Sequence, residues 1–371
     1  VDSTDYYDGA QGQDTLHLVL TASLWASDAV KAEIAAYQEF LASHAPGAEF
    51  QFTSFDLKAV NFEHLTLEVV PDPVNYEPTD IALNGGDFGT VIEGEAGAVV
   101  GVLSVTDPNA ADTHTYTVSD PRFIVEGNTL RLMDGIALDF ESGSSSFQID
   151  VTVTDSGGLT RTESFTIEVK SVLTGAALDG YISGATVFAD TDEDGILDVG
   201  EASTVTDANG NFTLVGGSGP LVMTGGTDIW TGLAFDGVMR APEGSTVITP
   251  LTTLVAEIAG ADATPAEIAA ANALVLSALG LDPSLNLGAL DPIAMALSED
   301  TTTAALGAEA LAAAIQLQST IDQAAALLAG AGADADAATD AVIAALAVQI
   351  EGASGTVDFG DPGTIGAVLD A

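Results

Sequence analysis

The organisation of this chain is clearest around residues 190–201, which read DTDEDGILDVGE. Acidic side chains recur at alternate positions through the first half of this stretch, and Gly195 permits a sharp turn there. The segments on either side, residues 186–189 and 204–206, are rich in β-branched and aromatic residues and therefore predict strands. The stretch is predicted to be a polar loop between two strands, which makes residues 173–243 a β-module.

The oxygen-bearing positions of this loop follow the spacing of the twelve-residue EF-hand calcium loop at every ligand position. Without a cation these carboxylates would repel one another, because two unit charges about 4 Å apart interact by several kcal/mol at intermediate dielectric. The strand-like flanks indicate that an ion here would staple a β-domain rather than switch a pair of helices. The predicted Ca2+ ligands are Asp190, Asp192, Asp194, Ile196 through its carbonyl, Asp198 and Glu201.

The segment around the loop, residues 175–224, resembles the small transthyretin-like β-sandwich modules of bacterial surface proteins. The residues that carry the resemblance are GATVF at 184–188, the acidic loop, and TDANGNF at 206–212. Asn209-Gly210 predicts a hairpin turn without a ligand role. Strands are predicted at residues 181–189, 204–206, 212–214 and 221–224.

A second all-β segment, residues 79–172, precedes the module. Its β-branched and alternating stretches are separated at short intervals by Gly, Asn, Asp and Pro, which fits a sandwich of about 95 residues. Residues 72–78 in front of it form a linker, because its prolines restrict the backbone to extended geometry. The predicted strands of the sandwich are residues 99–105, 113–118, 123–125, 129–132, 148–154 and 164–169.

Residues 76–172 resemble a bacterial cadherin-like repeat. The signature consists of EPTDI at 77–81, VTDPN at 105–109, LDFE at 138–141 and VTDSGG at 153–158. The family binds calcium at the junctions between repeats, and the chain departs from its pattern in having Asn109 in place of the usual second Asp and KSVLT, without an acidic cluster, at 170–174. The resemblance implies calcium ligands that face the preceding linker, Asp107, Asn109 and Asp155, and ligands that face the following one, Glu93, Asp139 and Glu141.

Residues 1–71 predict a small α/β unit, with strands at 15–20, 49–52 and 65–70 and an amphipathic helix at 27–44 that Ser27 can cap. Residues 7–16 read YDGAQGQDTL and resemble one degenerate copy of the glycine- and aspartate-rich nonapeptide of repeats-in-toxin (RTX) proteins. That resemblance implies Asp8 and Asp14 as calcium ligands, whereas the residues alone also suit a polar turn before a strand.

Alanine dominates residues 244–371, and helical spacing replaces β-branched alternation there. Thr264 and Glu267 form a capping box with Pro265 at the first helical position, and Gly280 ends that helix. Two further helices are predicted at residues 304–328 and 337–350. Helices so rich in alanine can pack closely or provide a face for homotypic association. The region resembles no family.

The charge balance excludes several classes of function. The chain holds 55 Asp and Glu against 7 Lys and Arg, so it would repel nucleic acid and anionic lipid. It has no cysteine, no apolar run of 18 residues for membrane insertion and no segment resembling a signal peptide. Its first residue is Val1 rather than Met, and the chain is expected to be a piece of something longer. No nucleophile, zinc or phosphate-loop motif surrounds its 4 histidines, and a non-enzymatic protein is predicted.

Together these features predict a multidomain chain: a small α/β unit, two mainly-β sandwiches and an Ala-rich all-α region. The predicted function is that of a calcium-stabilised, non-enzymatic segment of a large bacterial RTX-type adhesin or surface stalk, extracellular and active in cell adhesion or biofilm attachment. Its partners would be neighbouring domains of the same long chain and a surface glycan or protein. The alternatives are a self-assembling subunit of a matrix fibre or surface layer and, more weakly, a sugar- or peptide-binding tip domain.

Overall fold

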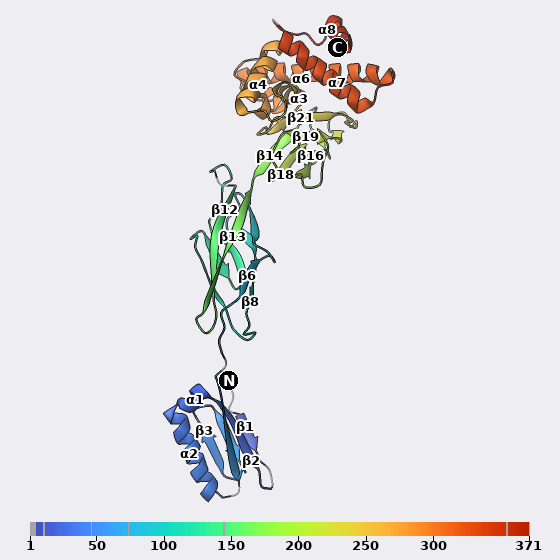
Figure 1. Cartoon of the computed structure of the whole chain (residues 1–371). Coiled ribbons are helices and arrows are strands. Elements are labelled where there is room, and N and C mark those ends of the chain that lie inside the picture. The colour runs from blue at the N-terminus through green and yellow to red at the C-terminus, as the bar shows by residue number, and fades with distance from the viewer. Residues whose placement is uncertain are drawn as a thin grey trace. The chain divides into compact units, whose positions relative to one another are not determined.

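The computed structural model describes residues 5–9, 12–45, 47–72, 74–143, 145–353 and 355–370 (Figure 1). The chain divides into two compact units. The first contains the residues up to Thr79 together with residues 106–115 and 154–161. The second contains residues 80–105, 116–153 and 162–371. No helix within the described residues is both long enough and apolar enough to cross a membrane.

The first unit begins with a small α/β fold. Strand β2 pairs in parallel with β5, and three other strands form a sheet in the order β1-β4-β3. The apolar face predicted for the long helix is buried, with Tyr37 packed edge-on against Phe52. The strands are β1 (Asp5–Asp8), β2 (Thr15–Thr21), β3 (Glu49–Phe52), β4 (Leu57–Val60) and β5 (His64–Val70). The helices are α1 (Ala22–Ala26) and α2 (Asp28–Ser43).

Two local predictions for this unit need correction. Tyr7 and Asp8, interpreted as part of an RTX-like turn, form the end of strand β1, because they pair in parallel with Ala59 and Val60 of β4. Residues 10 and 11 of that motif lie outside the described residues. Ser27 occupies the N-cap position of α2 but its side chain makes no cap hydrogen bond, so the cap there is positional only.

The second unit contains a sandwich of two four-stranded sheets, with strand orders β10-β11-β8-β6 and β7-β13-β12-β9. Its core includes Leu103, Leu130, Val151 and Phe165, all almost fully buried. All six predicted strands are present, and β6 and β7 are additional. The strands are β6 (Asp80–Leu83), β7 (Phe88–Ile92), β8 (Val99–Thr106), β9 (Thr115–Val118), β10 (Phe123–Glu126), β11 (Thr129–Leu132), β12 (Ser146–Thr154) and β13 (Thr160–Lys170).

A β-module follows directly, with sheets β18-β14-β22, β15-β20 and β17-β16-β19-β21. The single strand predicted at residues 181–189 is two strands, because Gly184 adopts a left-handed φ of 70° between them. The Asn209-Gly210 turn is present, but the strands it joins, β17 and β18, belong to different sheets and so do not form a hairpin ladder. The strands are β14 (Val172–Ala177), β15 (Ile182–Ser183), β16 (Thr186–Ala189), β17 (Ser203–Val205), β18 (Asn211–Val215), β19 (Leu221–Thr224), β20 (Thr227–Asp228), β21 (Val238–Ala241) and β22 (Val247–Ile248).

The last part of the second unit is helical. The capping box of α4 is formed in both directions by Thr264 and Glu267, and Gly280 ends the helix in the left-handed conformation, as predicted. Alanines such as Ala310 and Ala324 are buried where the helices pack. The helices are α3 (Pro250–Ala259), α4 (Pro265–Leu279), the 3-10 helix η1 (Leu287–Ala289), α5 (Pro292–Ala296), α6 (Thr301–Gly330), α7 (Ala335–Gly352) and α8 (Pro362–Asp370).

The β-module and the helices share backbone and hydroxyl contacts. Strand β22 pairs in parallel with β14, so strand structure continues past residue 243. In the first turns of α3, the Thr252 hydroxyl donates to the carbonyl of Arg240, and the Thr253 hydroxyl accepts from the Arg240 amide. The observed architecture, an α/β unit followed by β-sheet domains and an all-α region, confirms the predicted fold class.

Candidate metal centres

Three groups of carboxylates converge within the described residues. In each group, one oxygen from every side chain lies within 4.8 Å of the others. Eight of the nine residues are predicted from the sequence, and Asp112 is the exception. The groups are Asp190, Asp192 and Asp194; Glu93, Asp139 and Glu141; and Asp107, Asp112 and Asp155.

The loop group lies in the connection between β16 and β17. Asp190 directly follows β16 and is only 3% exposed. Its Oδ2 accepts a hydrogen bond of 2.9 Å from the Gly195 amide, while its Oδ1 is buried with no hydrogen-bond partner among the described residues. A buried carboxylate oxygen without a donor is costly. A cation bound by Asp190, Asp192 and Asp194 would satisfy it, so the residues present fit a Ca2+ ion.

Electrostatics at Asp190 point the same way. Burial raises the pKa of its carboxyl, and the negative charges of Glu201 and Asp194 raise it further, although the hydrogen bond from Gly195 lowers it. The charged form is therefore disfavoured without a counter-ion. A divalent cation would remove this penalty by supplying positive charge directly to the loop.

The other predicted loop ligands are organised by the loop's own backbone. Glu201 accepts hydrogen bonds from the amides of Thr191, at 2.6 Å, and Asp198, at 3.0 Å. These bonds hold both of its oxygens over the loop, but Glu201 and Asp198 do not fall within the group of three aspartates. Ile196 has a largely exposed side chain, as expected of a residue that would contribute only its carbonyl.

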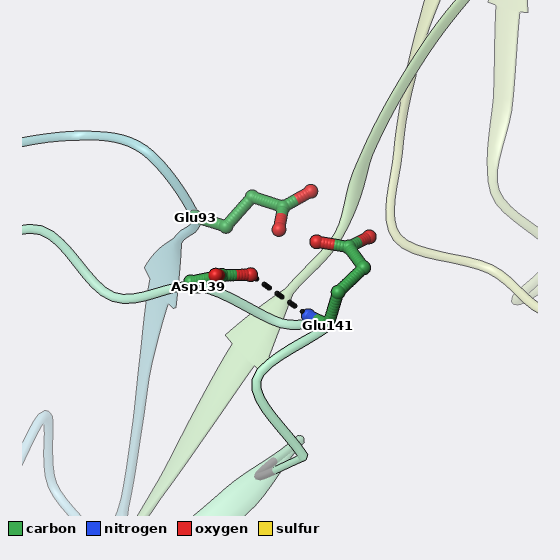
Figure 2. Close-up of side chains that lie close together, drawn as sticks. All are labelled: Glu93, Asp139 and Glu141. Carbon is green, nitrogen blue, oxygen red and sulfur yellow. Dashed lines mark hydrogen bonds between the residues drawn. The ribbon is translucent and has the colours of Figure 1, made fainter.

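The second group lies between the sandwich and the β-module (Figure 2). Glu93 follows β7, and its two oxygens accept from the amides of Phe140, at 3.1 Å, and Val172, the first residue of β14. Asp139 accepts from the Glu141 amide at 3.0 Å, which turns the two acidic side chains toward Glu93. The group thus ties a turn of the sandwich to the start of the next module.

The pKa of Glu141 in this group is raised. A hydrogen bond from its own backbone amide lowers it, but burial, together with interactions with Glu93 and Asp139, outweighs that bond. Neighbouring carboxylates that must all ionise destabilise one another. A divalent cation would reverse this effect, and the three side chains supply the oxygen ligands that Ca2+ prefers.

The third group lies in the first unit, beside the linker in front of the sandwich. Asp155 is 6% exposed, and its Oδ2 accepts from the Nδ2 of Asn75 at 2.9 Å. Asn109 accepts from the Tyr76 amide and donates to the Val74 carbonyl, both at 2.8 Å. Asn109 and Asp155 therefore contact the preceding linker, the position that the cadherin-like resemblance implies for them.

Asp112 is the member of this group that sequence reasoning missed. Its Oδ1 accepts from the Ser156 hydroxyl at 2.8 Å, and its Oδ2 is buried with no partner among the described residues. Asp107 accepts hydrogen bonds from His114 and from the Asn109 amide, and these bonds, chiefly that from His114, lower the pKa of its carboxyl. The available signal was the short spacing in DPNAAD at residues 107–112, where a third oxygen-bearing side chain follows Asp107 and Asn109.

Comparison with known proteins gives no family. No family model matches the chain, and no curated protein sequence matches it. Human protocadherin-24 EC1-2 is 13% identical, with a TM-score of 0.22, over 46% of this chain and 95% of that chain. The human desmocollin-1 ectodomain is 14% identical, with a TM-score of 0.22, over 50% of this chain and 43% of that chain. Drosophila N-cadherin EC1-3 is 11% identical, with a TM-score of 0.22, over 55% of this chain and 78% of that chain.

Likeness this distant carries no argument about the present chain. The cadherin-like, transthyretin-like and RTX resemblances therefore stay predictions, and the case for a metal rests on the geometry of the three groups. Each of them combines clustered oxygens with a penalty that a cation would relieve, whether a buried oxygen without a donor or a raised carboxyl pKa.

The remaining predicted ligands, Asp8 and Asp14, are not brought into a group of three within the described residues. Asp8 accepts from the Nδ2 of Asn61 at 2.8 Å. The backbone amide of Asp14 donates to Glu63 at 2.7 Å, and its Oδ2 is buried without a hydrogen-bond partner in the described part of the chain. Asp8 ends β1 and Asp14 directly precedes β2, and their role as calcium ligands stays a prediction.

Proposed function

We propose that this chain is a calcium-stabilised, non-enzymatic segment of an extracellular adhesin or surface stalk. The observation that carries the proposal is the convergence of three carboxylate groups, each within 4.8 Å and each at a turn or junction between elements. Among the described residues, none of the nine carboxylates has a Lys or Arg ion-pair partner, and only Asp107 pairs with a histidine. Hard oxygen ligands at this density suit Ca2+.

Calcium would act here through geometry and mass action. An ion held by each group would neutralise its carboxylates and fix the turn that carries them. Because the unfolded chain does not hold these oxygens together, the ion would bind the folded state selectively and stabilise it. Extracellular calcium fills modules with dissociation constants of roughly 10⁻⁴–10⁻³ M, so sites of modest affinity would be occupied outside the cell.

The proposal extends to partners and location. A chain with 55 acidic and 7 basic residues suits an extracellular setting rich in calcium and would not bind nucleic acid. Its partners would be neighbouring domains of a longer bacterial surface protein of RTX type, with a glycan or protein as the adhesive target and a role in biofilm attachment. The sequence contains no nucleophile, zinc or phosphate-loop motif, and we infer that the chain is not an enzyme.

A second candidate function is a self-assembling fibre or surface-layer subunit. It is favoured by apolar side chains exposed on two helices, Ile315 and Leu327 on α6 and Val348 on α7, which are 54%, 59% and 60% exposed. Light scattering after size-exclusion chromatography, across calcium concentrations, separates the two functions. A stalk segment is expected to stay monomeric, whereas a fibre subunit is expected to form assemblies of increasing mass.

The primary test is a calorimetric titration of the metal-stripped chain with calcium, paired with melting curves. The wild type is expected to bind several ions and to melt higher as they bind. Asp190→Asn, Asp139→Asn and Asp107→Asn are each expected to remove one ion. Glu309→Gln, which changes an exposed carboxylate on α6, is the matched control and is expected to bind as the wild type does. Absence of binding at millimolar calcium would contradict the proposal.

A further inference from the structure

The calcium loop makes contacts beyond its own ligands. Glu193 lies between two predicted ligands, adopts a left-handed φ of 61° and is not a member of the aspartate group. Its Oε1 accepts a hydrogen bond of 2.9 Å from the backbone amide of Asp262. Asp262 belongs to the connection between α3 and α4, so the loop is bonded directly to the helical region.

Arg240 forms a second link between the loop and the helices. It is the sole basic residue between positions 171 and 371. Its Nη1 lies 2.9 Å from Oδ1 of Asp340 on α7. Its Nη2 lies 3.3 Å from the place where a Cβ on Gly195 would stand, so the guanidinium packs against the loop backbone. Its own backbone is bonded to the hydroxyls of the α3 capping turn.

These two links flank a cavity of about 840 Å³. One wall is the loop itself, with Asp190, Thr191 and Glu193, and the opposite wall comes from α3, the α3–α4 connection and α7. Because a cavity separates them, the loop and the helices are not joined there by a continuous apolar core. The polar links through Glu193 and Arg240 join the loop to the helices across this cavity, in addition to the pairing of β14 with β22 and the hydroxyl contacts of α3.

We propose that Glu193 and Arg240 couple calcium occupancy of the loop to the packing of the α3–α4 connection and α7. The inference rests on the proposed function, since it requires calcium in the loop. An ion held by Asp190, Asp192 and Asp194 fixes the backbone between them, and that backbone presents Glu193 and Gly195 to their partners. Glu193 and Arg240 are positioning residues rather than ligands. Calcium in the loop then stabilises the contact between the β-module and the helices as well as the β-module itself.

Coupling of this kind is reciprocal. If calcium favours this contact by a given factor, the contact favours calcium binding by the same factor. Removing either link is therefore expected to weaken calcium binding at the loop even though no ligand is altered. A purely structural contribution of Glu193 or Arg240 would lower overall stability without changing the calcium-dependent difference.

Hydrogen exchange of the full chain, with and without calcium, tests the proposal. In the wild type, calcium at about ten times its Kd is expected to slow exchange up to about tenfold in peptides covering residues 190–201, 256–264 and 335–345. In Glu193→Ala and Asp340→Asn the loop peptide is still protected, but the two helical peptides lose their calcium dependence and calcium affinity falls by a matching factor. Glu351→Gln, which alters an exposed carboxylate near the end of α7, is expected to behave as the wild type.

The outcomes separate the inference from the proposed function. If calcium protects the loop peptide but leaves both helical peptides unchanged in the wild type, the coupling is wrong and the calcium site stands. If calcium protects none of the three peptides, the coupling and the calcium site are both contradicted. If the variants keep the wild-type calcium dependence at the helices, other contacts transmit the effect and the roles assigned to Glu193 and Arg240 are overturned.

Discussion

The loop group and the second group, Glu93, Asp139 and Glu141, which we call the junction group, hold the same number of carboxylates but are built differently. Asp190, Asp192 and Asp194 are neighbours in sequence, so the group needs only one tight turn. Glu93 and Glu141 are separated by a large part of the sandwich, since Glu93 follows β7 of one sheet and Glu141 lies beyond β11 of the other. Calcium bound at the loop would therefore depend on local order, whereas calcium bound at the junction group would depend on the tertiary fold.

Chelation of calcium is expected to have the largest effect on the free energy of unfolding, since it empties all three groups at once. Each filled site contributes about 2.7 kcal/mol to the free energy of unfolding when calcium stands at 100 times its Kd. Differential scanning calorimetry with and without a chelator is expected to show a fall of that size for every site that is emptied. A melting temperature that does not respond to the chelator would show that neither group binds a stabilising calcium ion.

Asp190→Asn separates the loop group from the junction group. With calcium present, the variant is expected to lose up to about 2.7 kcal/mol, because one ion no longer binds. Without calcium it is expected to melt above the calcium-free wild type, because the substitution removes a buried charge that its neighbours oppose. Thermal melts in both conditions measure this reversal of sign, and a loss of stability in both would contradict it.

Asp179 provides a contrast, as an acidic side chain outside the three groups. Burial, with the charges of Asp322 and Asp228, raises its pKa to about 6. The folded chain thus holds this proton more tightly than the unfolded chain, whose value is 3.8. Its contribution is complete below the unfolded value and is lost as pH rises through about 6.

The expected size of this loss is on the order of 2 kcal/mol, since one pKa unit corresponds to about 1.4 kcal/mol and the group is partly solvated. Asp179→Asn is expected to flatten the dependence of unfolding free energy on pH across that window, measured by denaturant titration in the presence of chelator. An unchanged slope would mean that Asp179 ionises normally in the folded chain.

Thr264→Ala is expected to cause the smallest loss in the free energy of unfolding, and it serves as a calcium-independent reference for the other variants. It removes the side-chain cap of α4, worth about 1 kcal/mol. The cap lies outside the three carboxylate groups, so the loss is expected to be the same with and without calcium in paired melts. A loss that depends on calcium would show that α4 itself takes part in the coupling through the α3–α4 connection.

Sequence reasoning succeeded mostly where the structural cause is local, although the Ser27 cap and the unbroken strand 181–189 were local predictions that proved wrong. The loop 190–201, the capping box at Thr264 and the strands of the sandwich follow from spacing over a few residues. It failed where the cause is long-range: β22 is a strand only because it pairs with β14, and the Arg240–Asp340 pair joins residues 100 positions apart. Asp112 lies between these cases, since its motif was visible but its buried oxygen was not.

The scarcity of basic residues leaves the second half of the chain with very few sites for cleavage by trypsin. Trypsin cuts after lysine or arginine, and residues 171–371 offer it one bond, after Arg240. That residue lies in strand β21, paired with β19, and its side chain is only 25% exposed. An intact fold hides the one cleavable bond in 201 residues, so limited tryptic digestion of this half is all or nothing: it survives whole, or it breaks into two pieces of residues 171–240 and 241–371.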